Sequence, residues 1–397
     1  MSEMVDACVP GWSVEVSPPA AEGAPSMVKV KSGGSSEAQF SGSYPVQMVH
    51  GVTYPGWCSE QRRDKLQREL KLRSDDVLVV SYPKCGTTWA EQCILLLQNR
   101  GDTSKMDPAA KNVYVPSNRE APGKIWPEAC VEQNPVVHTK LVTGNEFVPI
   151  TMDEFDDAPS PRTLKSHAPP HLLLTGGPTM RPDQAPGMAS LPLGVKVLVV
   201  TRNPLDACVS SYYHAWNPFE SGWPFDAWAA AWLSGNVPHG CWFDWVKSWK
   251  AVAEDPQFAD RILWVQYEDL KADPVGTVRR VASFLDPALA ADEALVASVS
   301  NASSFDAMKE QAAAGAGKVA KAAAAAAAAA EETGSGAGKP AAAATAGHSH
   351  LRKGVAGDWR NHFTAEVRAA FDRKYQQKLA GTGIEFSLGA GEGVMRA

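Results

Sequence analysis

The sequence predicts an α/β fold, a P-loop-like doubly wound central parallel sheet flanked by helices, in a single domain. Residues 77–82, 196–202 and 262–267 are short runs rich in β-branched and aliphatic residues, as is typical of strands buried on both faces of a parallel sheet. Residues 162–167 are predicted as a shorter fourth strand. Helical patterns follow these runs, and alternating strands and helices are typical of doubly wound sheets.

The composition favours a soluble protein with a large core. The chain has 397 residues, 44% hydrophobic and 21% charged, and its net charge of −6 does not indicate binding to nucleic acid or to an anionic membrane. Seven cysteines without a CxxC pattern favour a reducing compartment. No apolar run approaches the roughly 18 residues of a membrane span. The first 40 residues contain acidic residues but no arginine, unlike a transit peptide. We therefore expect a cytoplasmic protein.

Low-complexity segments divide the chain. Residues 1–43 are rich in Gly, Ser, Pro and Ala and are predicted to be a disordered N-terminal extension. The globular domain is expected over residues 44–390. An Ala/Gly/Lys insertion at 312–347 interrupts it, and this insertion is predicted to be flexible or marginally helical because its terminal charges oppose the helix dipole. Residues 101–161 are irregular, as a binding loop or lid would be.

The loop after the first strand is a candidate anion site. Pro83 ends the strand because it cannot donate a hydrogen bond to the sheet. Gly86 allows a tight turn, and Thr87 and Thr88 can cap the helix that follows. Backbone N–H groups, the helix end and the Lys84 ammonium then face one point, although an ordinary strand–turn–helix is the alternative. This is not the usual nucleotide-triphosphate loop, because that motif places its lysine after the second glycine, whereas Lys84 precedes Gly86.

Two other strand ends carry candidate site residues. His167 stands where α/β sheets place ligands, although a single histidine is more often a surface or packing residue. Arg202 ends the third strand and Ser210 lies two turns into the next helix, so both could reach one ligand phosphate. The alternative for Arg202 is an ion pair with a nearby carboxylate. Asn203 and Pro204 are a strong start signal for the helix.

The remaining helices are predicted from caps and apolar spacing. Residues 61–73 have a charged helical pattern, Asp273 caps a helix that begins at Pro274, and residues 301–309 are a turn that opens a short helix. Two more helices are predicted from packing stripes, at Trp242, Trp245, Val246 and Trp249 and at Val367, Phe371 and Tyr375.

The string Tyr82-Pro-Lys-Cys-Gly-Thr-Thr-Trp89 resembles the 5′-phosphosulfate loop of the cytosolic sulfotransferases, which usually has serine where Cys85 stands. Five further stretches resemble motifs of that family and follow in the family's order, so that the matches together span about residues 44–385. Six ordered matches arise by chance far less readily than one. The five are residues 162–169, 196–214, 267–271, 304–309 and 352–359.

The resemblance implies transfer of a sulfuryl group from 3′-phosphoadenosine 5′-phosphosulfate (PAPS), as co-substrate, to a hydroxyl or amine of a small-molecule acceptor. It implies His167 as general base and Lys84 and Lys165 as groups that stabilise the transition state, with no metal. The residues that it implies for the co-substrate are Lys84, Cys85, Gly86, Thr87, Thr88 and Trp89 at the 5′-phosphosulfate, Arg202, Ser210, Arg352, Lys353 and Gly354 at the 3′-phosphate, and Trp89, Tyr267, Ser303 and Phe305 at the adenine, next to Ser304 and Met308.

The chain departs from the family pattern at two places. The Cys85 thiol is a weaker hydrogen-bond donor than the usual serine. Residues 360–369 follow the family's dimer motif only in part, with Ala365 and Ala369 in place of its valine and glutamate, so the motif for a homodimer is degraded.

Two other functional classes remain as alternatives. A P-loop phosphotransferase using ATP and magnesium would need a Gly-Lys-Ser/Thr loop, which is missing here. A non-catalytic protein could retain the nucleotide pocket, but the presence of Lys84, Lys165 and His167 argues against it. The sequence does not identify the acceptor.

Overall fold

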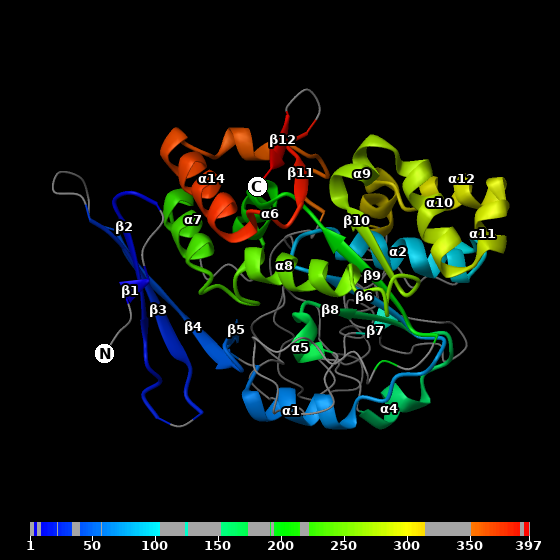
Figure 1. Cartoon of the computed structure of the whole chain (residues 1–397), viewed down its shortest axis with the longest axis horizontal. Coiled ribbons are helices and arrows are strands. Elements are labelled where there is room, and N and C mark those ends of the chain that lie inside the picture. The colour runs from blue at the N-terminus through cyan, green and yellow to red at the C-terminus, as the bar shows by residue number, and fades with distance from the viewer. Residues whose placement is uncertain are drawn as a thin grey trace, which may run out of the picture.

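A five-stranded parallel sheet lies at the centre of the molecule, with strand order β10-β9-β6-β8-β7 (Figure 1). In this computed structural model the described residues are 4–5, 9–21, 23–33, 40–56, 58–103, 124–125, 152–173, 191, 194–214, 222–313, 351–389 and 393–396. The strands are β6 (Val77–Ser81), β7 (Lys124–Ile125), β8 (Thr163–Ser166), β9 (Lys196–Thr201) and β10 (Ile262–Gln266). The parallel sheet and the four strands predicted from the sequence are therefore confirmed.

Both faces of this sheet are buried, as the apolar runs predicted. Val77 and Val79 of β6 belong to one hydrophobic cluster, whereas Leu78 and Val80 belong to the other. Successive side chains of a strand point to opposite faces, so an uninterrupted apolar run serves two layers. The first cluster includes α2 (Thr87–Gln98), α10 (Pro274–Leu285), α11 (Pro287–Ala291) and α12 (Glu293–Ala302); the second includes α5 (Pro170–Leu173), α6 (Pro204–Tyr212), α7 (Phe225–Ser234), α8 (Trp242–Ala253) and α14 (Ala365–Leu379).

The N-terminal region forms a second, antiparallel sheet (Figure 1). Its strands are β1 (Met4–Val5), β2 (Trp12–Ser17), β3 (Ser26–Ser32), β4 (Ser41–Val49) and β5 (Val52–Pro55). The prediction of a disordered extension over residues 1–43 is therefore wrong for the strands that it contains, and β4 runs across the expected boundary at residue 44.

The reason for this sheet is a pattern with a period of two. Val28 and Val30 of β3 are buried, whereas Lys29 and Lys31 between and after them point outward. One apolar face of this kind must be covered, and here it joins the same hydrophobic cluster as α7 and α8. The N-terminal strands are therefore part of the domain rather than an appendage.

Local signals placed most helix starts correctly. Asn203 caps α6 through a hydrogen bond from the Asp206 N–H, and Asp273 caps α10 in the same way from Gly276. Tryptophans 242, 245 and 249 are buried along α8, and the stripe of α14 is buried at Val367, Phe371 and Tyr375. The charged pattern at 61–73 corresponds to α1 (Glu60–Glu69). The helix after the first strand, by contrast, is capped by Gly86 without a side-chain hydrogen bond, so the predicted threonine cap is wrong.

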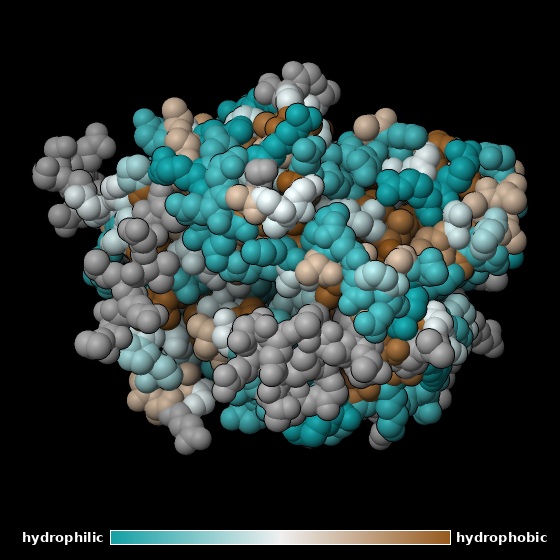
Figure 2. All heavy atoms as spheres, in the orientation of Figure 1, coloured by the Kyte–Doolittle hydropathy of each residue, from teal (hydrophilic) through white to brown (hydrophobic). Residues whose placement is uncertain are grey.

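Several short elements carried no clear sequence signal for their secondary structure. They are α4 (Met152–Asp157), α9 (Tyr267–Ala272), η4 (Asp358–Asn361), β11 (Glu385–Ser387) and β12 (Val394–Arg396). Of the predicted insertion at 312–347, all but residues 312 and 313 lies outside the described residues, as does most of the irregular segment 101–161. The visible face in Figure 2 is mostly hydrophilic, with hydrophobic residues in small separate groups. Within the described ranges, no helix is long and apolar enough to cross a membrane.

Candidate active site

The carboxyl ends of four adjacent strands bring the candidate residues to one edge of the sheet. Lys84 follows β6, His167 follows β8, Arg202 follows β9 and Tyr267 follows β10. The chain leaves β6 for the strands on one side and later returns to β9 on the other, so β6 and β9 flank the topological switch point where α/β sheets bind ligands. At this point the Arg202 guanidinium donates a hydrogen bond to the Lys84 carbonyl oxygen, at 3.4 Å.

The loop after β6 presents its backbone to the site. Gly86 has a φ of +111°, and a Cβ atom there would lie 3.2 Å from the Tyr267 ring. No side chain caps the start of α2, since the Thr87 hydroxyl pairs with Ser81 Oγ at 2.5 Å. The first N–H groups of a helix have no intrahelical partners, so this helix end can bind an anion.

Two further side chains of the loop are buried. The Cys85 sulfur lies 3.8 Å from the Pro83 carbonyl oxygen, and burial raises the pKa of the thiol to about 12, so it stays protonated at neutral pH. Trp89 is buried, and its indole N–H has no hydrogen-bond partner among the described residues. This unpaired donor is suited to a ligand that approaches the loop.

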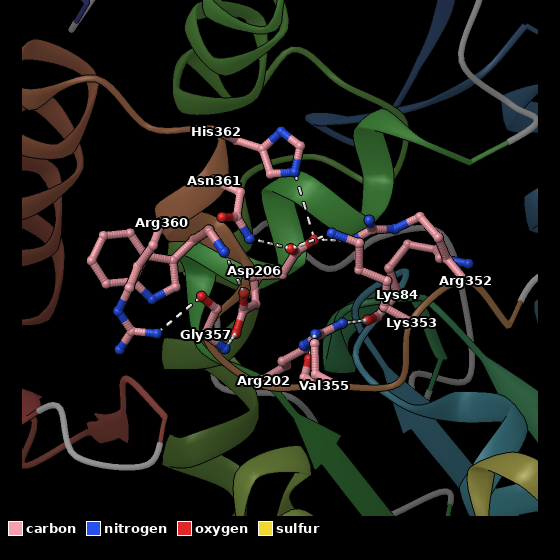
Figure 3. A network of polar contacts seen from close by, with 12 residues as sticks. Lys84, Arg202, Asp206, Arg352, Lys353, Val355, Gly357, Arg360, Asn361 and His362 are labelled. Atoms are coloured by element: carbon pink, nitrogen blue, oxygen red, sulfur yellow. Dashed lines mark hydrogen bonds and ion pairs between the residues drawn. The ribbon is translucent and has the colours of Figure 1, made fainter.

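Positive charge converges beside the loop. Burial is the main cause that lowers the pKa of Lys84 to about 7, and the charges of Arg202, Arg352 and Lys165 lower it further. Figure 3 shows Lys84 close to the two arginines. Within the described part of the chain no carboxylate forms an ion pair with Lys84. A partly buried cluster of cations of this kind is suited to an anionic ligand.

Arg202 is held in place by neutral groups. It donates to the Val355 carbonyl at 2.9 Å, and its guanidinium lies 4.4 Å from the centre of the Tyr267 ring. Its Nε is buried without a hydrogen-bond partner, and no carboxylate of the described residues pairs with it. The alternative of an arginine that serves an ion pair is therefore not supported, and the guanidinium keeps donor capacity for a ligand.

The segment after Leu351 closes over the same point. Arg352 pairs with Asp358, and the Lys353 ammonium lies 2.6 Å from the same carboxylate. Burial would raise the pKa of Asp358, but hydrogen bonds from Lys353, Arg352 and Asn361 outweigh it and hold that pKa well below its usual range. Gly354 has a φ of +67°, and a Cβ atom there would collide with the Phe305 ring.

Asp206 docks this segment onto α6 (Figure 3). Its buried carboxylate accepts hydrogen bonds from the backbone N–H groups of Gly357, at 2.6 Å, and Trp359, at 3.0 Å. Asn203 donates to the same carboxylate at 3.0 Å. The two N–H groups of Gly357 and Trp359 tie the segment that carries Arg352 and Lys353 to α6, while Asn203 holds the carboxylate in place.

His167 lies beside the two lysines. Its Nδ1 is 2.8 Å from the Ser81 carbonyl oxygen, which assigns the hydrogen to Nδ1 and leaves Nε2 as the basic nitrogen. Burial is the largest cause that lowers the pKa of the imidazole to about 3, and the charges of Lys165 and Lys84 lower the pKa further. The hydrogen bond to Ser81 acts in the opposite direction and raises it. The ring is therefore neutral at physiological pH, with Lys165 and Lys84 as its charged neighbours.

Other predicted residues have hydroxyls or side chains engaged elsewhere. Ser303 donates to the Val299 carbonyl at 2.7 Å, Ser304 Oγ accepts from the Ala307 N–H at 3.3 Å, and Met308 is buried in the cluster with α2. The side chains of Thr88 and Ser210 are only partly buried and make no hydrogen bond with described residues, which leaves both hydroxyls available.

The structure adds residues that sequence reasoning did not single out. Glu268 accepts from the Asn203 backbone at 3.0 Å and its amide at 2.8 Å, and burial raises the pKa of this carboxyl to about 7. The Lys271 ammonium lies 5.5 Å from the Tyr267 ring and 5.6 Å from the Phe305 ring. Glu268 and Lys271 belong to the motif at 267–271, and Asp358 belongs to the motif at 352–359. Asp206 follows the helix cap Asn203 by three residues. Each of these residues therefore had a signal in the sequence.

Comparisons with known proteins agree with these motifs. The family model described as "Sulfotransferase domain" matches residues 74–383. The chain is 26% identical to sulfotransferase 2A2 of Rattus norvegicus over 338 residues, which is 83% of this chain and 94% of the relative. It is 28% identical to sulfotransferase 1B1 of Mus musculus over 347 residues, 86% of this chain and 94% of the relative.

Solved structures share the fold. Mouse sulfotransferase SULT7A1 complexed with PAP has a TM-score of 0.53 at 23% identity, covering 84% of this chain and 94% of that chain. Retinol dehydratase in a complex with retinol and PAP has a TM-score of 0.58 at 19% identity, covering 91% of this chain and 92% of that chain. Since the family model spans most of the sequence, the chain belongs to the sulfotransferase family.

Proposed function

We propose that this sulfotransferase moves a sulfuryl group from PAPS to a hydroxyl or amine of a small-molecule acceptor. The observation that carries the proposal is the convergence of Lys84, Arg202 and Arg352 at the switch point of the sheet, next to a neutral His167. Structural neighbours were solved with PAP, which is 3′,5′-adenosine diphosphate, the nucleotide product of such a transfer.

The residues present fit a nucleotide with an anionic group at each end of its ribose. Lys84 and the uncapped start of α2 would hold the 5′-phosphosulfate, with Gly86, Thr87 and Thr88 lining it. Arg202 and Arg352 would bind the 3′-phosphate together with Ser210, Lys353 and Gly354, because guanidinium groups fork onto phosphate oxygens. The adenine would be enclosed by Phe305, whose ring packs against Gly354, and by Tyr267, whose ring faces the Arg202 guanidinium. The other residues around it would be Trp89, Ser303, Ser304 and Met308.

The tautomer and the neutral state of His167 suit proton removal from the acceptor. Its Nε2 would take the acceptor's proton as the acceptor oxygen or nitrogen bonds to sulfur and the bond from sulfur to the 5′-phosphate oxygen breaks. Lys84 would neutralise the charge that develops on the leaving phosphate, and Lys165 that on the transferring group. The imidazole of His167 is neutral in the free protein, so its Nε2 can accept a proton from the acceptor.

The described cysteines and the residues of the dimer motif bear on the setting of the reaction. Among the described residues Cys85, Cys93, Cys208 and Cys241 are free thiols, which supports a reducing, cytoplasmic compartment. The degraded dimer motif at 360–369 spans the end of η4 and the first turn of α14, and a homodimer through it remains a prediction. No group of three or more potential metal ligands occurs among the described residues.

A binding measurement and a turnover assay test the proposal. Thermal-shift stabilisation by PAP but not by Mg-ATP separates a sulfotransferase from a P-loop phosphotransferase. Transfer of label from PAPS to a panel of phenols and alcohols then separates an enzyme from a binding protein that kept the nucleotide pocket. Stabilisation by Mg-ATP alone, or PAP binding without any turnover, would overturn the assignment.

A further inference from the structure

A second histidine, His239, lies next to the proposed base. It belongs to the turn between α7 and α8, and its ring centre is 5.1 Å from that of His167, with the two planes at 68°. On its other side the ring packs edge-on against Tyr54 of β5 at 5.2 Å. The side chain therefore sits between the reacting edge of the sheet and the N-terminal sheet.

The ring of His239 is polar, buried and unsatisfied. The residue is only 7% exposed, its Nδ1 is buried without a hydrogen-bond partner, and no other hydrogen bond of the ring is formed with described residues. A buried nitrogen without a partner costs about 1–3 kcal/mol, so such groups in native proteins call for an explanation. A ligand that reaches the neighbouring His167 would be able to supply the missing partner.

The backbone holds this ring in place against a conformational preference. His239 has a φ of +74°, in the left-handed region that side chains other than glycine rarely adopt. The backbone N–H of His239 donates to the Thr53 carbonyl at 2.7 Å. The hydroxyl of Tyr82, two residues before Lys84, donates to the Gly240 carbonyl at 2.7 Å. The strained turn is thus fixed from two sides, and strain of this kind is concentrated at functional sites.

The charge around His239 selects the kind of group that it can bind. Burial, then His167 and Arg63, lower the pKa of His239 well below its ordinary value, so its imidazole is neutral. The Arg63 guanidinium lies 5.5 Å from the Tyr54 ring centre, and Lys165 is a charged neighbour of His167. These positive charges disfavour a cation near the two histidines, whereas a neutral oxygen can accept from or donate to the imidazole.

We propose that His239 binds a second oxygen of the acceptor, on the carbon next to the one that bears the reacting hydroxyl, and so favours catechols and vicinal diols over simple phenols and alcohols. This inference rests on the proposed sulfuryl transfer with His167 as base. With their ring centres 5.1 Å apart, the two imidazoles are close enough for both to contact one small acceptor, such as a 1,2-diol whose two oxygens are neighbours. His239 is then a specificity-determining residue.

The test compares catechol with phenol as acceptors, since they differ by one hydroxyl. The wild-type kcat/KM for catechol should exceed that for phenol by about 10-fold or more, because phenol leaves the buried imidazole unpaired. In His239→Leu the ratio of kcat/KM for catechol to kcat/KM for phenol should fall to the statistical value that two equivalent hydroxyls give without any contact to residue 239. His239→Asn, of similar size and tolerant of a positive φ, should retain part of the preference. PAP affinity and melting temperature, measured for each variant, show that it is folded.

The outcomes separate this inference from the proposed function. An unchanged catechol-to-phenol ratio in folded His239→Leu, or equal losses for both acceptors, would overturn the role of His239 while leaving sulfuryl transfer intact. A wild type that prefers phenol would also overturn it. If the wild type neither binds PAP nor sulfates any acceptor, the proposed function fails instead.

Discussion

The Nδ1 atom of His167 lies 2.8 Å from the carbonyl oxygen of Ser81, the last residue of β6. Because a carbonyl oxygen can only accept, this contact sets the tautomer and points the basic Nε2 away from the strand. It also ties the residue after β8 to the strand that leads into the Lys84 loop. The proposed base and the Lys84 loop therefore keep a fixed relation, which is what proton transfer in a defined geometry needs.

Replacing His167 by alanine should lower turnover by roughly 10²–10⁴-fold, the usual contribution of a general base. PAP affinity, measured by calorimetry, should stay within a few-fold of the wild type, since the imidazole acts on the acceptor. A variant that turns over like the wild type would remove His167 from the mechanism.

The low pKa of Lys84 predicts a pH dependence of nucleotide binding. With a pKa of about 7, the ammonium is charged below neutrality and loses its proton as the pH rises. An anionic ligand favours the charged form, so PAP affinity should fall between about pH 7 and pH 9, and binding in that range should take up protons. Calorimetry in buffers of different ionisation enthalpy measures the uptake.

The matched control for this prediction is Lys84→Arg, because a guanidinium stays protonated throughout that range. Its PAP affinity should be nearly constant from about pH 7 to pH 9. An equal pH dependence in wild type and variant would place the titrating group elsewhere.

Arg202→Ala and Arg352→Ala should each weaken PAP far more than 5′-AMP, which lacks the 3′-phosphate. Only PAP has a 3′-phosphate for these guanidiniums to bind, and charge-assisted hydrogen bonds contribute roughly 1.5–3 kcal/mol each. Arg280→Ala is the control, since Arg280 is half exposed and pairs with Asp269 on the surface. Equal losses for both nucleotides would mean that the arginines act through folding.

Asp206→Asn should destabilise the domain and weaken PAP binding together. The amide keeps one accepting oxygen but loses the charge that receives the N–H groups of Gly357 and Trp359. We expect a loss of about 2–4 kcal/mol in the free energy of unfolding in guanidinium chloride. Asp269→Asn, a surface change, should stay close to the wild type. A stable variant with reduced PAP affinity would show that Asp206 positions the segment without supporting the fold.

The packing of the N-terminal sheet predicts that Val28→Ala lowers the free energy of unfolding by about 1–3 kcal/mol, because a cavity replaces buried methyl groups. Val275→Ala on the exposed face of α10 should change it by less than about 0.5 kcal/mol. Equal stabilities of the two variants would contradict the contribution of this sheet to the core.

The sequence alone determined the parallel sheet, because an apolar run such as 77–82 is stable only when both of its faces are covered. It also determined where Lys84, His167 and Arg202 lie, since strand ends in a parallel sheet share one edge. The N-terminal sheet was readable in principle from the alternation of Val28, Lys29 and Val30, but such short strands become stable only through their long-range pairing.

The tertiary structure decided the remaining features of the site, because they depend on contacts between residues that are distant in the chain. Asp206 receives the N–H of Gly357 across 151 residues, and no local pattern reports such a bond. The pKa of Lys84 is low only because burial and three other cations meet at one point. His239 lies beside His167 only because β5 and Tyr82 hold its turn there. Local sequence sets backbone preference and the burial of one face, whereas electrostatics and hydrogen bonding depend on distances that exist only after folding.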